Sequence, residues 1–210
     1  MWLRDESAMQ VDLTTHNEIL ERCTIDHGGE FVKSTGDGVL AVFDDPVRAV
    51  LAACAMRQGL EEADWEGARP IVARMGIHHG WAMRQGADYY GKDVAFTARL
   101  HDCANGGQII VSSAIERRLA EVPGVSLRAL GRHRLRNFPE GVEVFQVDDD
   151  GHRQSFAPLR TIDAQPGNLH QPTTTILGRT DELEHLAALV HEHRLTTLCL
   201  LYTSPSPRDS

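Results

Sequence analysis

The residues best suited to chemistry lie in one short stretch, Lys33-Ser34-Thr35-Gly36-Asp37-Gly38. Apolar pairs flank it, Phe31-Val32 before and Val39-Leu40 after, which predicts a β-hairpin because Gly supplies the positive φ of a tight turn. Such a turn projects the Asp37 carboxylate clear of the sheet, and Mg²⁺ is typically held by one or two carboxylates together with substrate phosphates. Lys33 lies on the first strand, close to that carboxylate. From the hexapeptide alone, half of a metal site and a solvated turn are equal alternatives.

Composition narrows the class of protein. The chain has 210 residues, 41% hydrophobic and 24% charged, with a formal net charge of -9. This balance is typical of a soluble globular protein and argues against direct nucleic-acid binding, which needs clustered Lys and Arg. We find no window of transmembrane length and no signal peptide. The four cysteines have neither CxxC nor zinc-like spacing, so we expect reduced thiols in a cytoplasmic protein.

Helices are expected where apolar residues recur at helical spacing, over 6–27, 46–62, 94–104 and 113–121. The second of these begins at Asp45-Pro46, an N-cap residue followed by Pro at the first helical position. Its predicted core face consists of Val47, Val50, Leu51, Cys54, Ala55 and Leu60. Strands are expected at the hairpin and over 71–78, 108–112, 132–135 and 142–147.

The order of these elements is that of an α+β fold, the ferredoxin-like βαββαβ palm, with the first strand missing. That strand is the central one, so we expect it upstream of Met1. Because its absence leaves unpaired backbone groups at the core, we expect residues 1–210 alone to be poorly folded and inactive.

The domain prediction has four parts. Residues 1–148 form the first domain, 149–175 a linker that begins at an acidic run and contains several prolines, and 176–198 the start of a following module. Residues 199–210 resemble the translation of a sequencing adapter, so we expect them to be foreign to the natural protein.

Four motifs, the first of them in the hairpin turn, follow one another along the chain. They are Gly36-Asp37-Gly38, Gly76-Ile77-His78-His79-Gly80, Asp88-Tyr89-Tyr90-Gly91-Lys92-Asp93-Val94 leading to Ala98-Arg99-Leu100, and Gly106-Gly107-Gln108-Ile109. Together they resemble the catalytic domain of class III adenylate and guanylate cyclases. The chain is similar to the bacterial type fused to an ATPase and transcription-regulator module, here truncated at both ends. The resemblance covers about residues 2 to 147.

This resemblance implies an enzyme, a phosphorus–oxygen lyase that makes cyclic nucleotides for intracellular signalling. The ribose 3′-hydroxyl of ATP attacks its own α-phosphorus, giving 3′,5′-cyclic AMP and pyrophosphate. Two metal ions, Mg²⁺ or Mn²⁺, assist the attack in such sites. The family uses two aspartates to hold them: Asp37 matches the second, and the first would lie on the strand upstream of Met1.

The same resemblance implies a homodimer with composite active sites. Lys33 and Asp88 would bind the purine base of ATP in the partner's site, with GTP as the alternative substrate. Lys33 would donate to a ring nitrogen and Asp88 would accept from an exocyclic amine. Arg99, eleven residues after Asp88, matches the arginine that stabilises the pentavalent phosphorus.

One position departs from the family pattern. Ala95 stands where the family has an asparagine that orients the ribose, and losing one positioning contact costs about a hundredfold in rate. The alternative function is therefore a catalytically degenerate, nucleotide-binding or dimerising sensor of a multidomain regulator.

Two neighbouring pairs receive structural interpretations. His78 and His79 are adjacent on a strand, so they should face opposite sides, one in the core and one at the surface. Tyr89-Tyr90 is interpreted as packing and turn structure.

Overall fold

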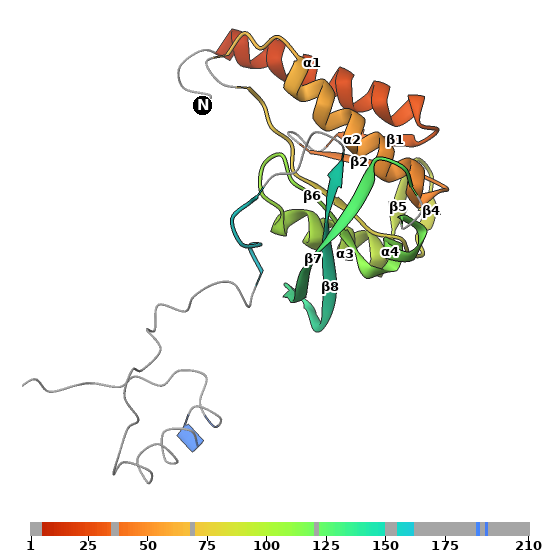
Figure 1. Cartoon of the computed structure of the whole chain (residues 1–210), viewed down its shortest axis with the longest axis vertical. Helices are drawn as coiled ribbons and strands as arrows, with labels where there is room; N and C mark the ends of the chain where they lie inside the picture. Colours follow the sequence, from red (N-terminus) through yellow and green to blue (C-terminus); the bar gives the residue numbers. More distant parts are fainter. Residues whose placement is uncertain are drawn as a thin grey trace, which may run out of the picture. The chain divides into compact units, whose positions relative to one another are not determined.

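The computed structural model describes residues 6–34, 38–67, 70–119, 122–149 and 155–161, and the three residues 188, 189 and 192 (Figure 1). The chain divides into two compact units, Met1–Pro166 and Gly167–Ser210. In the second unit the described residues are helical. The first unit carries the fold discussed below.

Helices and strands alternate along the described part of the first unit (Figure 1). In chain order they are α1 (Glu6–Asp26), β1 (Glu30–Ser34), β2 (Val39–Val42), α2 (Pro46–Glu62), β3 (Met75–Ile77), β4 (Met83–Gln85), β5 (Asp88–Tyr90), α3 (Lys92–Cys103), β6 (Ile109–Ser112), α4 (Ser113–Leu119), β7 (Val125–Leu135) and β8 (Phe138–Asp149).

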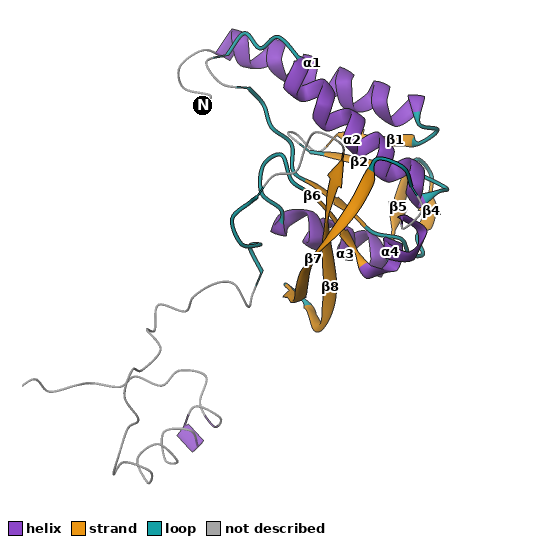
Figure 2. Ribbon diagram, in the orientation of Figure 1, coloured by secondary structure: helices purple, strands orange, loops and turns teal. Residues whose placement is uncertain are grey.

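The largest sheet has the order β3-β6-β8-β7, with β3 parallel to β6 and the other neighbours antiparallel. Two hairpins form separate two-stranded sheets, β1-β2 and β4-β5. Figure 2 shows α1 and α2 side by side above the β1-β2 hairpin, and these helices are in contact. This mixed architecture confirms the predicted α+β, ferredoxin-like class. The hairpin β1-β2 does not pair with β3 in this structure.

The core lies on both faces of the central strand β6. Ile109 and Val111 contribute to the cluster under α1, α2 and α4, whereas Ile110 contributes to the cluster with Leu100 of α3. Successive side chains of a strand point to opposite faces, so a strand covered by helices on both sides is a continuous apolar run. All four residues of β6 are buried, which explains why this strand was found from the sequence.

Helix α2 begins as predicted. Asp45 Oδ1 accepts a hydrogen bond of 3.0 Å from the Val47 N–H, and Pro46 occupies the first turn. The predicted core face is wrong at Leu51, which is 36% exposed. The buried residues of the helix are Pro46, Val50, Ala52, Ala53, Met56, Arg57 and Leu60. The buried face differs from the predicted one because α2 packs against α1 as well as against the sheet. Its buried residues therefore do not form one stripe at helical spacing.

Strand lengths differ from the sequence prediction. β3 covers only Met75–Ile77 of the expected 71–78, whereas β7 and β8 form a hairpin longer than expected. The hairpin β4-β5 was not predicted at all. Its strands have three residues each and are largely exposed, so they carry little of the apolar alternation that identifies a strand.

Three cysteines, Cys23, Cys54 and Cys103, are free thiols, as the spacing predicted. Cys199 lies outside the described residues. Burial, together with the negative charge of Asp149, raises the pKa of Cys54 to about 12. The thiolate is the reactive form, so the raised pKa disfavours reaction of this thiol at neutral pH.

Part of the predicted linker packs on the first unit. Leu159 is buried in the cluster with Leu100, and the Arg160 N–H donates to the Cys103 carbonyl at 3.0 Å. Asn105 Nδ2 also donates to the carbonyl of Ala157 at 2.9 Å. The segment 155–161 therefore covers the end of α3. The predicted linker and second-module residues otherwise lie mostly outside the described residues, so the four-part division stays a prediction.

Asp12 of α1 holds the segment after α2 in place. Its carboxylate is 2% exposed and accepts hydrogen bonds from the N–H groups of Glu66 and Gly67, at 2.8 and 2.9 Å. Asp12→Ala would leave two backbone donors without their partner, and we expect a loss of about 2–4 kcal/mol in the free energy of unfolding. Urea denaturation measures this loss. Glu18→Ala, at an exposed position of the same helix, is the control and should change stability little.

Candidate active site

Lys33 and Asp88 lie 55 residues apart in the chain and meet in the fold, Lys33 on β1 and Asp88 on β5. Lys33 Nζ donates to Asp88 Oδ2 at 2.5 Å, with the two side chains 43% and 25% exposed. The hydrogen bond from Lys33, helped by one from the Tyr89 N–H, lowers the pKa of the Asp88 carboxyl. The structure thus brings together the two residues assigned to the purine base. Their role in binding it stays a prediction.

A second polar contact joins the same two hairpins. Glu30 of β1 accepts from Arg84 Nη2 and from the Tyr89 hydroxyl, both at 2.9 Å. The Arg84 guanidinium also lies over the Tyr89 ring, 5.6 Å from its centroid. The hydrogen bond to the Glu30 carboxylate raises the pKa of Tyr89. Glu30, Arg84 and Tyr89 therefore fasten β5 to β1, which sets the approach of Lys33 to Asp88.

Sequence reasoning missed the contacts among these three residues because it missed the hairpin β4-β5. One signal was present: Gly86 and Ala87 form a two-residue loop between the paired residues Gln85 and Asp88. Gly86 has a φ of 63°, and Gly at the first central position is typical of a tight hairpin turn. Tyr89, interpreted as packing, in fact donates a specific hydrogen bond.

Arg99 lies on α3, and its guanidinium pairs with Asp102 one turn later, Nη1 to Oδ2 at 2.8 Å. The two side chains are 40% and 50% exposed, and exposed pairs of this kind hold a side chain weakly. Within the described residues no hydrogen bond or ion pair joins Arg99 to the Lys33–Asp88 pair. Ala95, one turn before Arg99, is exposed. Both positions are thus accessible from solvent on the same helix.

Asp37, the predicted metal ligand, lies outside the described residues. The two strands that flank this turn are paired with each other, Ser34 at the end of β1 with Val39 at the start of β2. Among the described residues no group of three His, Cys, Asp or Glu side chains is gathered in a way that fits a metal ion.

His78 and His79 face different environments, as predicted, but neither is on a strand, because β3 ends at Ile77. His78 is partly buried: its Nδ1 is 2.7 Å from Ser112 Oγ, and its ring is 4.4 Å from that of Phe96. His79 is exposed. Burial lowers the pKa of His78, and the carboxylate of Asp93 offsets this only in part. His78 is therefore a packing residue that is favoured in its neutral form.

This lowered pKa gives a pH dependence of stability. As the pH falls below about 6.5, the unfolded chain binds the His78 proton before the folded chain does, so the free energy of unfolding decreases until the folded pKa is passed. We expect His78→Gln to have a flatter profile than the parent between about pH 7.5 and pH 5. Urea titrations across this range test it. Equal slopes for His78→Gln and the parent would contradict the assignment.

The family model of the adenylate and guanylate cyclase catalytic domain matches residues 3–148. The chain belongs to this family. An uncharacterized protein of Mycobacterium tuberculosis is 30% identical to this chain over 188 residues, covering 87% of this chain and 64% of that protein. An adenylate cyclase of Lachancea kluyveri is 30% identical over 138 residues, 54% of this chain and 8% of the enzyme. The chain thus spans less than two thirds of the length of each of these curated relatives.

Solved structures have the same fold as this cyclase domain. The adenylate cyclases of Trypanosoma brucei in their monomeric state align with a TM-score of 0.66 and 23% identity, over 77% of this chain and 88% of theirs. An adenylate/guanylate cyclase/hydrolase from Silicibacter pomeroyi aligns with a TM-score of 0.62 and 26% identity, over 70% of this chain and 89% of its own. In the described part of the cyclase domain, no helix is both long and apolar enough to cross a membrane.

Proposed function

We propose that this cyclase domain converts ATP into 3′,5′-cyclic AMP and pyrophosphate. The 3′-oxygen forms a bond to the α-phosphorus, the bond from that phosphorus to the bridging oxygen breaks, and pyrophosphate leaves. The proton of the 3′-hydroxyl passes to solvent or to a nearby base. The family membership supports a cyclase; the choice of ATP rests on the Lys33–Asp88 pair.

The observation that carries the proposal is the meeting of Lys33 and Asp88. An ammonium has three donors and a carboxylate has several acceptor positions, so each group keeps hydrogen-bonding capacity while the pair is formed. Adenine presents a ring-nitrogen acceptor beside an exocyclic amine, and this pair supplies the complementary donor and acceptor. The contacts of Glu30 with Arg84 and Tyr89 hold that donor and acceptor in register.

The remaining roles follow the family assignment. Asp37 would hold Mg²⁺ or Mn²⁺, which supplies charge to offset that of the triphosphate. Arg99 would stabilise the negative charge that grows on the phosphoryl oxygens. The enzyme would act as a homodimer, in which Lys33, Asp88 and Arg99 of one copy serve the site that holds Asp37 of the other.

The test is an assay of the purified full-length protein with ATP or GTP and with Mn²⁺ or Mg²⁺, followed by chromatography of the products. Formation of cyclic AMP from ATP in excess of cyclic GMP from GTP supports the proposal. Nucleotide binding without either product would instead identify the degenerate sensor suggested by Ala95. An excess of cyclic GMP would overturn the choice of substrate.

Base binding by the pair gives a specific prediction. Lys33→Ala and Asp88→Ala each remove one charged hydrogen-bonding group, and we expect the Kd for a non-hydrolysable ATP analogue to rise about tenfold in each variant. Isothermal titration calorimetry measures it. The matched control is Lys92→Ala, an exposed lysine at the start of α3, which should bind as the parent does. Unchanged affinity in both test variants would remove the pair from the base site.

A further inference from the structure

The segment 155–161, which follows β8 in the chain, lies against the C-terminal end of α3 (Figure 1). We call this segment the strap. Its last three residues alternate between buried and exposed: Leu159 is 4% exposed and Thr161 is 2% exposed, whereas Arg160 between them faces solvent. Connecting segments usually run over the surface, so side chains this well buried make the strap a part of the domain.

The strap supports the last turn of α3 in two ways. Leu159 belongs to the same buried cluster as Leu100 and Cys103 of the helix. The Arg160 N–H donates to the Cys103 carbonyl at 3.0 Å. That carbonyl is one of the last four of the helix, which have no partner within the helix itself. The strap thus supplies both an apolar cover and a backbone hydrogen bond to this end of α3.

Arg99 stands in the part of α3 that the strap supports. It directly precedes Leu100, and Cys103 Sγ donates to its carbonyl at 3.2 Å. Residues four apart are neighbours on a helix, so a movement of Cys103 moves the backbone of Arg99. The Arg99 side chain is held weakly, because its ion pair with Asp102 is half-exposed. The place of the guanidinium therefore depends on the backbone of this turn.

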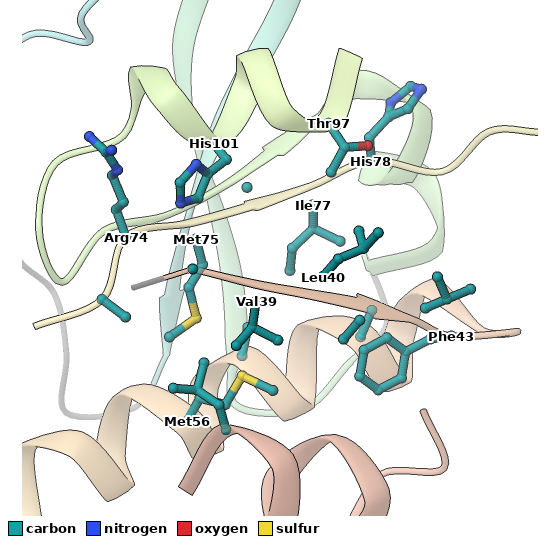
Figure 3. Close-up of a pocket in the computed structure, with 18 of the residues that line it drawn as sticks. Val39, Leu40, Phe43, Met56, Arg74, Met75, Ile77, His78, Thr97 and His101 are labelled. Carbon is teal, nitrogen blue, oxygen red and sulfur yellow. The ribbon is translucent and has the colours of Figure 1, made fainter. Parts of the chain in front are cut away.

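A second face of α3 packs on β3. Gly76 of β3 lies so close to the helix that a Cβ there would meet the His101 backbone nitrogen at 2.5 Å. Figure 3 shows Thr97 and His101 of α3 beside β3, where they line a cavity of about 580 Å³ between β2 and β3. The helix is thus supported on two faces, and the strap contributes Leu159 to the face turned away from this cavity.

The strap is itself attached to the largest sheet at both of its ends. Asn105 Nδ2 donates to the Ala157 carbonyl at 2.9 Å, and the Asn105 N–H donates to Oε1 of Gln108 at 3.0 Å. Gln108 is buried and directly precedes β6. At the other end, Thr161 Oγ1 lies 3.2 Å from Nδ1 of His133 on β7. These attachments let the strap hold the end of α3 against the sheet.

We propose that the strap is a positioning element for Arg99. While docked, it holds the last turn of α3, and with it the arginine, in the place that turnover requires. The boundary to the second unit follows Thr161 closely in the chain, so an event there that lifts the strap would lower turnover without contacting the nucleotide. The inference rests on the proposed role of Arg99 in the cyclase reaction.

Arg160→Pro tests the backbone contact. Proline has no N–H to donate to Cys103, and its fixed φ suits the turn closed by the Thr161 N–H on the Leu159 carbonyl at 2.9 Å. The matched control is Arg160→Ala, which removes an exposed side chain and keeps the N–H. In the full-length protein we expect the amides of residues 99–104 to exchange about fivefold faster in Arg160→Pro than in Arg160→Ala, with α1 unchanged. Hydrogen exchange followed by mass spectrometry measures this.

Leu159→Ala tests the apolar contact through steady-state kinetics. Uncovering the end of α3 displaces a charge that acts in the transition state, so we expect kcat to fall about tenfold while KM changes little. Leu159→Met keeps most of the buried volume and should restore the parent's kcat. Asp12→Ala, which destabilises the domain away from α3, shows how much of the loss follows from lower stability alone, and it should keep the parent's kcat.

Faster exchange at residues 99–104 in Arg160→Pro, together with a lower kcat in Leu159→Ala, supports the proposal. It is overturned if these amides exchange equally in Arg160→Pro and Arg160→Ala, if exchange rises but kcat does not fall, or if Asp12→Ala loses as much kcat as Leu159→Ala. If the parent itself forms no cyclic nucleotide, the proposed function fails, and the exchange result alone decides whether the strap holds Arg99 in place.

Discussion

Asp37→Ala is expected to lower cyclic-nucleotide formation by the full-length protein at least about 10³-fold. A bound metal ion contributes several kcal/mol to stabilising transition-state charge, and each step of about 1.36 kcal/mol is a factor of ten in rate. In the sequence, Asp37 lies between β1 and β2, and Lys33 is the second-last residue of β1. The Asp37→Ala rate is measured with saturating ATP across a series of Mn²⁺ concentrations, since a weakened metal site is partly rescued at high metal.

The matched control for this experiment is Asp44→Ala. Asp44 is an exposed carboxylate just after β2, near Asp37 in the chain but outside the hairpin turn. It should keep the parent's rate and metal dependence. Turnover of Asp37→Ala within about tenfold of the parent would remove Asp37 from the metal site, because a loss of about 1.4 kcal/mol is too small for a lost metal ligand.

Arg99→Ala should lower kcat about 10²–10³-fold while changing KM little, as expected for a charge that acts mainly in the transition state. In this structure the Arg99 guanidinium is held by Asp102 at 2.8 Å. Because the pair is half-exposed, it contributes little and the arginine is free to turn toward a triphosphate. Steady-state kinetics with ATP separate the two parameters.

Asp102→Ala distinguishes a catalytic arginine from a structural ion pair. Removing Asp102 frees Arg99 without removing its charge, so turnover should stay within about fivefold of the parent. If Asp102→Ala loses as much rate as Arg99→Ala, the ion pair itself is what matters, and Arg99 is a positioning residue. If Arg99→Ala instead raises KM and leaves kcat unchanged, Arg99 contributes to ground-state binding of the triphosphate.

Much of the fold was predictable because its signals are local. The boundaries of α2 follow from Asp45, Pro46 and the apolar spacing, and the structure begins and ends this helix where the sequence predicted. β6 is a short apolar run buried on both faces. Leu51 shows the limit of such reasoning: its spacing fits the core face, but α1 and the sheet together decide which side of α2 is covered.

The hairpin β4-β5 and its contacts were beyond the sequence. Three-residue exposed strands have almost no apolar pattern, and the bonds of Glu30 to Arg84 and Tyr89 connect residues 54 and 59 positions apart. Such pairs are set by the packing of one hairpin on another, for which neither segment carries a local signal.

The sequence by itself determined the cyclase family and the identity of Lys33, Asp37, Asp88 and Arg99 as candidate residues, because their types and spacing are properties of the chain. Only the tertiary structure decided that Lys33 and Asp88 share a hydrogen bond, that Arg99 is paired with Asp102, and that β2 and β3 border an open groove. The physical reason is distance: hydrogen bonds and strand pairing act over a few ångströms, and only folding brings residues 55 positions apart within that range.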